Sequence, residues 1–202
     1  MKRIVYAAAL AGLAAGLALT LIQQLQIAPL LRAAEAFETG GHGSPPALLA
    51  TMAANIVLAT GFALILGSAL AVRASGGWRA GFLWGLAGYA VFFVAPSLGL
   101  PPELPGTESA ALHERQWWWL ATVALSAGGL WLAAFAKKPA LRILGIVLIA
   151  APHVVGAPQP AQHGSTAPAA LAEEFVRAAY VANAIFWLLL GSLLGYFFKP
   201  RA

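Results

Sequence analysis

Long apolar runs that carry almost no charge dominate this chain. The first extends from Ile4 to Ile22, about 19 residues without one charged side chain. At about 1.5 Å per helical residue, a run of this length crosses the roughly 30 Å of hydrocarbon in a bilayer. Only 9% of the 202 residues are charged, whereas soluble domains average about 25%. The sequence therefore predicts an integral membrane protein made of helices.

Six apolar segments are expected to cross the bilayer as one polytopic, all-α helix bundle that forms a single domain, residues 1–202. The segments are residues 4–27, 47–72, 80–100, 117–136, 143–158 and 175–198. The fifth is the weakest, because it is short and contains Pro152 and His153. A bundle of five transmembrane helices is therefore the alternative.

Charged residues separate by side once these segments are placed in a membrane. With six crossings, nine of the twelve Lys and Arg residues fall on one side, and all seven Glu and four His residues fall toward the other. Lys and Arg concentrate in cytoplasmic loops, so both termini are expected in the cytoplasm. Five crossings would instead place the two basic ends on opposite sides. The basic residues lie in short loops, so the +5 net charge does not indicate nucleic-acid binding.

Several kinds of chemistry lack the residues they need. The chain has no Cys, which excludes disulfides and thiolate metal sites. It has neither the Gly-x-x-x-x-Gly-Lys-Ser/Thr loop of ATPases nor the His-Glu-x-x-His pair of metalloproteases. No tightly bound cofactor is expected, and an enzyme is not the favoured class.

Carboxylates and imidazoles on the acidic side are ligands for hard or borderline divalent cations. Glu35, Glu38 and His42 are three and four residues apart, so on a helical turn they would share one face. An ordinary solvated loop is the alternative. Glu103 stands in a stiff loop of three prolines, which presents one carboxylate. His163, in a Gly/Ser/Pro loop, is a weaker candidate for which a solvated imidazole is favoured.

His153 is the most informative single residue. It follows Arg142 by eleven residues, or about 16 Å along a helix. An ionisable side chain at that depth is costly and is a functional candidate by default. Pro152 removes one backbone hydrogen bond and frees a carbonyl near Leu148. A metal ligand and a neutral His bonded to a neighbouring helix both stay open.

Small and amide residues have predicted roles in the membrane. Asn55 and Asn183, each preceded by Ala near the acidic end of a helix, are expected to line the pathway. Close helix packing is predicted for the glycine pairs with four-residue spacing, which are Gly12/Gly16, Gly81/Gly85 and Gly191/Gly195. Ala-Pro ends each outward-running helix, at Ala28-Pro29, Ala95-Pro96 and Ala151-Pro152. This suggests three similar hairpins, although Ala is common throughout.

Three motifs together resemble one known family. They are Pro102-Glu103-Leu104-Pro105-Gly106, Arg115-Gln116-Trp117-Trp118 and the run Pro152-His153-Val154-Val155-Gly156-Ala157-Pro158-Gln159-Pro160. In combination they resemble the probable cobalt transporter subunit family, CbtA. The basic first helix, Glu35-Ala36-Phe37-Glu38 and the last helix fit the same pattern, so the resemblance covers nearly the whole chain.

The resemblance implies a multi-pass protein of the bacterial inner membrane that supplies cobalt for cobalamin synthesis. It implies a partner like CbtB, a small subunit with a single span and a His-rich end. The family is usually described with five spans, against the six expected here. The loop Gly40-Gly41-His42-Gly43 has one His, where relatives often carry a His-rich stretch.

The expected function is therefore that of a subunit of an uptake transporter for a divalent transition metal. Glu35, Glu38 and His42 would gather the ion with Glu103 and His163 nearby, and would pass it to His153. The cargo would be Co²⁺, with Ni²⁺ as the alternative, because raw affinity favours Ni²⁺. An accessory or scaffold protein, or a membrane enzyme with an outward-facing His/Glu site, stays open.

Overall fold

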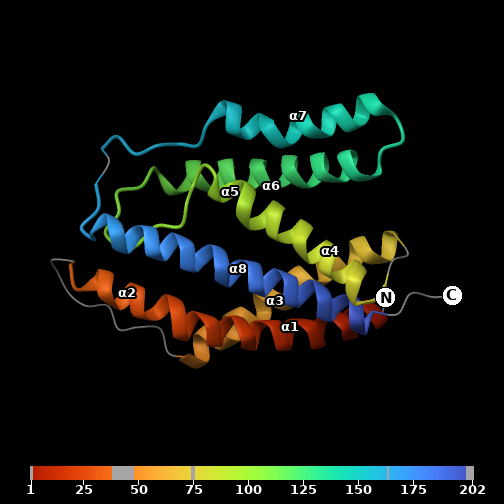
Figure 1. The fold of residues 1–202 in the computed structure, drawn as a ribbon, viewed down its shortest axis with the longest axis horizontal. Helices are drawn as coiled ribbons and strands as arrows, with labels where there is room; N and C mark the ends of the chain where they lie inside the picture. The colour runs from red at the N-terminus through yellow and green to blue at the C-terminus, as the bar shows by residue number, and fades with distance from the viewer. Residues whose placement is uncertain (1, 38–47, 74–75, 163, 199–202) are drawn as a thin grey trace. The chain divides into compact units, whose positions relative to one another are not determined.

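Every regular element of this chain is helical where the structure describes it. A computed structural model (Figure 1) describes residues 2–37, 48–73, 76–162 and 164–198. The elements are α1 (Lys2–Ile22), η1 (Gln23–Ile27), α2 (Ala28–Glu35), α3 (Leu48–Val72), α4 (Trp78–Tyr89), η2 (Ala90–Val94), α5 (Ala95–Ser97), α6 (Leu112–Phe135), α7 (Pro139–Val155) and α8 (Ala169–Phe197), with η marking a π-helix.

Five continuous helical segments in the described residues are long and apolar enough to cross a membrane. They are Lys2–Glu35, Leu48–Val72, Trp78–Ser97, Leu112–Phe135 and Ala169–Phe197. The sixth, α7, is apolar but has only 17 residues, about 26 Å of helix against about 30 Å of hydrocarbon. The predicted all-helical membrane fold is confirmed, and a sixth crossing, by α7, stays a prediction.

The prediction that the first helix ends at Ala28-Pro29 is wrong. The chain instead passes through η1 directly before Ala28-Pro29 and continues helically to Glu35. A proline ring clashes with the carbonyl four residues earlier in an α-helix. In η1 the Ala28 N–H bonds the Gln23 carbonyl, five residues back, and this wider turn accommodates the ring. The same arrangement recurs where η2 directly precedes Ala95-Pro96.

The other predicted bounds shift because polar residues join the helix ends. The fourth segment starts at Leu112 and not at residue 117, and the sixth starts at Ala169 and not at residue 175, so Arg115 and Glu173 are helical. The second segment is Leu48–Val72, against the predicted 47–72. The third is Trp78–Ser97, against the predicted 80–100. The fifth begins at Pro139 and ends before Gly156, whose φ of 86° favours glycine.

The helices group into two compact units, which are described separately. Unit 1 holds Met1–Tyr89 and Arg177–Ala202, and unit 2 holds Ala90–Val176. In unit 1, α1 packs against α3. A Cβ placed on Gly16 would meet the Ile56 backbone at 2.6 Å, and one on Gly12 would meet the Thr60 backbone. In lipid, helices are not driven together by the hydrophobic effect, because the lipid tails are as apolar as the side chains. They associate through close packing of this kind.

A second glycine contact in unit 1 joins α4 to α8. Gly81 and Gly85 lie against Gly191 and Gly195, so the two backbones touch. Next to this contact, Trp187 is 2% exposed, and its ring packs on Phe62 with 4.6 Å between centroids. The Trp187 side chain also lies over Gly88. A large side chain thus fills the space that the small residues leave.

Unit 2 is built on the antiparallel pair α6 and α7, which lie side by side in Figure 1. Gly129 of α6 and Gly145 of α7 face each other, and a Cβ on either would come 2.5 Å from the other's carbonyl oxygen. The basic turn Lys137-Lys138 joins the helices at one end. We call the opposite end of this unit, with residues 98–111, 156–162 and 164–168, its acidic end.

Replacement of Gly191 by Val should destabilise the protein, because the added carbons would strike the α4 backbone. We expect a loss of about 1–3 kcal/mol, the usual cost of overpacking, measured by thermal unfolding in detergent. Gly61→Val is the matched control, because nothing lies within 4 Å of a Cβ at that α3 position. Equal unfolding temperatures for the two variants would contradict the packing described.

Candidate functional site

The acidic end of unit 2 is organised around the Glu103 carboxylate. Its Oε2 accepts a hydrogen bond from the Ser109 hydroxyl at 2.6 Å and pairs with the Arg115 guanidinium at 3.1 Å. The two charged side chains are only 26% and 30% exposed. Arg115 stands in the first turn of α6, so the pair fixes the loop to that helix. A cation at Glu103 would have to compete with this guanidinium.

The two loops at this end are tied to each other. Thr107 and Ser165 form an isolated antiparallel bridge, and their hydroxyl oxygens lie 3.3 Å apart. The Glu108 N–H donates to the Gly164 carbonyl at 2.9 Å. Leu104, within the Pro-rich loop, is buried. The stiff presentation of Glu103 thus depends on neighbours as well as on prolines.

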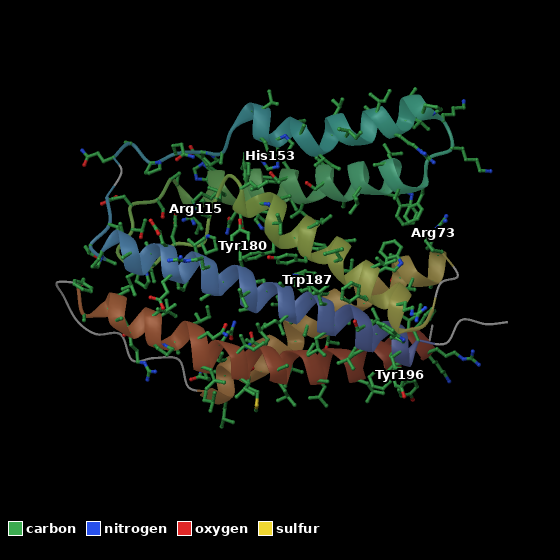
Figure 2. The ribbon with its side chains drawn as sticks, viewed as in Figure 1. Arg73, Arg115, His153, Tyr180, Trp187 and Tyr196 are labelled. Atoms are coloured by element: carbon green, nitrogen blue, oxygen red, sulfur yellow. The ribbon has the colours of Figure 1, made fainter. Side chains whose placement is uncertain are left out.

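His153 stands beside Trp118 in the same unit. The two rings meet edge to face with 6.1 Å between their centroids, and Figure 2 shows His153 between the ribbons of α7 and α6. Trp118 also lies against Gly99. Its Nε1 is buried and has no hydrogen-bond partner among the described residues.

The structure corrects the expected surroundings of His153. The prediction extended its helix to residue 158, but α7 ends at Val155, so His153 lies in the last turn. Gly156 and the loop that follows bring the acidic end within a few residues of the imidazole. An ionisable group near the end of a span costs less than one at its centre.

In unit 1 the Asn55 amide joins α3 to α1 and η1. Its Nδ2 donates to Thr20 Oγ1 at 3.0 Å and to Gln23 Oε1 at 2.7 Å, and Thr20 in turn donates to the Gly16 carbonyl. Asn55 and Thr20 are 7% and 6% exposed. Asn183 differs, because its Nδ2 bonds the Ala179 carbonyl of its own helix.

The predicted metal ligands fall into three groups. Glu38, His42 and His163 lie outside the described residues. Glu35 ends α2 in unit 1, while Glu103 and His153 belong to unit 2. Across the described ranges, no three His, Asp or Glu side chains gather closely enough to hold an ion. A gathering site at these residues therefore remains a prediction.

Sequence reasoning did not single out several residues that matter here. Ser109 and Thr20 gave no signal, because isolated hydroxyls are common. The run Gln23-Gln24-Leu25-Gln26 was a signal, since three amides close an apolar span. Gly129 and Gly145 lie on two different helices and lack the four-residue glycine spacing that marked the other pairs. Ser126 is 3% exposed, and its Oγ has no partner in the described chain.

A family model settles the broader identity. The model described as probable cobalt transporter subunit (CbtA) matches residues 1–199, essentially the whole chain. The chain belongs to the CbtA family. No curated protein and no solved structure gives a significant match. This CbtA-family chain is thus a transporter subunit by kinship, with several helices of membrane-spanning length.

The Glu103–Arg115 pair should couple in a double-mutant cycle. With both groups partly exposed, we expect a coupling energy of about 1 kcal/mol, measured by thermal unfolding of Glu103→Ala, Arg115→Ala and the double variant. Glu114→Ala is the control for one carboxylate lost from the exposed first turn of α6. Strictly additive effects of the pair would mean that the loop is held by other contacts.

Asn55→Ala should lower stability by roughly 0.6–2 kcal/mol, the range measured for hydrogen bonds between helices in membranes. The reason is the loss of two bonds from α3. Asn183→Ala provides the comparison, since its amide bonds only its own helix, and it should change the unfolding temperature less. An equal or larger loss at Asn183 would argue against the bridging role of Asn55.

Proposed function

We propose that this chain is the multi-pass subunit of a Co²⁺ uptake system in the bacterial inner membrane, and that it supplies cobalamin synthesis. The single observation that carries the proposal is the family match over residues 1–199. Five helices of membrane-spanning length among the described residues support it. We also propose that the basic turns face the cytoplasm, in keeping with the excess of Lys and Arg there.

The Glu and His side chains of this chain are suitable ligands for a borderline divalent cation. Imidazole and carboxylate are suitable ligands for Co²⁺, and Ni²⁺ would bind at least as tightly. We propose Glu35, Glu38, His42 and His163 as groups that attract the ion from outside. Glu103 contributes negative potential more than a free ligand, because Arg115 already pairs with it. His153 lies in the last turn of the apolar helix α7, beside Trp118.

A transport role also accounts for what the chain lacks. It has no phosphate-binding loop and no Cys, so energy and further ligands must come from elsewhere. The family description as a subunit implies a partner. We propose a small single-span protein like CbtB, whose His-rich end would supplement the few histidines here. We propose no catalytic activity, in accord with the family's description.

Reconstitution tests the proposal directly. The chain, alone and with its small partner, is placed in vesicles that enclose a Co²⁺-sensitive dye, and the rate of quenching is measured after Co²⁺ is added outside. Quenching above that of protein-free vesicles supports transport. Co²⁺ binding without flux in either preparation would indicate an accessory role. Neither binding nor flux would reject the proposal and favour a scaffold or an enzyme.

His153→Ala should reduce Co²⁺ uptake at least tenfold at limiting Co²⁺, because even the loss of a group that only supports a metal ligand weakens binding about 10–100-fold. Uptake is measured in cells with the protein quantified in the membrane fraction. His113→Ala is the matched control, because His113 is exposed in the first turn of α6. Unchanged uptake in the His153 variant would remove His153 from the pathway.

A further inference from the structure

Polar side chains line one side of α6 near α7, although glycine packing would be enough to hold the two helices together. Trp118, Thr122 and Ser126 recur every four residues on α6, which places them on one side of the helix. Thr122 is fully buried and Ser126 is 3% exposed. His153 of α7 meets Trp118 at the acidic end of this row. We call these residues, with Leu148 of α7, the α6–α7 seam.

Ser126, like the Trp118 Nε1, lacks a hydrogen-bond partner among the described residues. Ser and Thr in membrane helices commonly donate to the carbonyl four residues back, as Thr122 does to Trp118 at 2.8 Å. The Ser126 hydroxyl makes no such bond, and its buried Oγ has no partner in the described chain. A buried hydroxyl without a partner costs about as much as a lost hydrogen bond, so its persistence calls for a role.

The opposite face of the seam offers further oxygen. Gly145, Ile149 and Pro152 form the side of α7 that meets α6, since Gly129 contacts the first two and Pro152 is buried. Pro152 has no N–H, so the Leu148 carbonyl lacks its usual helical donor. Leu148 precedes Pro152 by four residues, so helical spacing puts it on the same side of α7 as Pro152.

The register brings these groups within about one helical turn of each other along the helix axes. Gly129 lies between Gly145 and Ile149, so in this antiparallel pair His153 comes level with Val123. Ser126 then lies about 4–5 Å further from the acidic end, at about 1.5 Å per residue. Below it, the Gly129–Gly145 contact brings the two backbones together. The seam therefore has an imidazole at its acidic end, oxygens one turn deeper and a closed floor.

We propose that the α6–α7 seam binds a divalent transition-metal ion, with the His153 imidazole and the Ser126 hydroxyl as direct ligands. Thr122 Oγ1 keeps lone pairs beside its own hydrogen bond, and the Leu148 carbonyl offers another oxygen. The mixed nitrogen and oxygen set suits a borderline cation. The Trp118 N–H, which cannot bind a cation, donates to a water that the ion retains. This inference rests on the proposed function and identifies the cargo's site within unit 2.

The Gly129–Gly145 contact gives this site a direction. Because the backbones touch there, an ion reaches Ser126 from the acidic end and stops. Release toward the basic turn requires the two helices to separate at the glycines. The seam is thus the occluded end of an outward-facing site, and movement of α7 against α6 is the step that opens it.

The absence of Cys from the chain allows a spectroscopic test. Ser126→Cys introduces one thiol, which loses its proton to the buffer when it binds Co²⁺. The resulting thiolate–Co²⁺ bond gives a charge-transfer band that is absent without thiolate. Ser68→Cys is the matched control, because Ser68 is exposed on α3 and bonds its own helix. We expect the band in the first variant, and its loss when His153→Ala is added.

Uptake provides the second readout. Ser126→Ala should lower Co²⁺ uptake at least fivefold at limiting Co²⁺, whereas Ser68→Ala leaves it unchanged. A folded Ser126→Cys protein without the band, or Ser126→Ala uptake equal to that of the unaltered chain, overturns the site. If Ser126→Cys does not fold, Thr122→Cys is used, and absence of the band there has the same meaning.

The experiment separates this inference from the proposed function. Flux in the unaltered chain with no band in the Ser126 variant rejects the seam and keeps transport. A band without flux in any preparation keeps the seam as a binding site and rejects transport by this chain.

Discussion

In hydrocarbon, every backbone N–H and carbonyl must find its partner within the protein, and the rest of this structure follows from that constraint. It makes every spanning segment helical. It also explains why the helix continues through a short π-helical segment before Pro29 and before Pro96, and does not end at either proline. Since lipid supplies no hydrophobic drive between helices, they associate where glycine lets backbones meet, as at Gly81 and Gly191.

The same constraint governs the polar side chains. Most of those described within the spans are bonded, as Asn55 is to Thr20 and Gln23. Glu103 is neutralised by Arg115 at the end of unit 2, so its carboxylate first serves the structure. Ser126 departs from this rule, because its buried hydroxyl has no partner in the described chain. The metal site proposed here lies at such an unpartnered hydroxyl, and not where charges are most numerous.

Much of the fold could be predicted from composition and spacing, and the failures have physical causes. The apolar runs located the six apolar helical segments of the described residues, because five of them have the length that a bilayer requires. Ala28-Pro29 was misread as an end, since sequence rules assume an α-helix and a π-turn removes the clash with proline. The start at Leu112 was missed because the polar residues before Trp117 fit a loop equally well. Of the site, His153 and Asn55 were singled out, but their partners were not.

The sequence by itself determined the class of protein, its helical segments and its kinship with the CbtA family, because length, hydropathy and motif combinations are local properties. Only the tertiary structure decided what each polar group touches. In the tertiary structure, Glu103 forms an ion pair with Arg115, and Asn55 donates a hydrogen bond to Gln23 of η1. The His153 ring lies beside the Trp118 ring. These pairings depend on the register between helices, which is set by close backbone contacts such as Gly129 against Gly145 and is not encoded in any single segment.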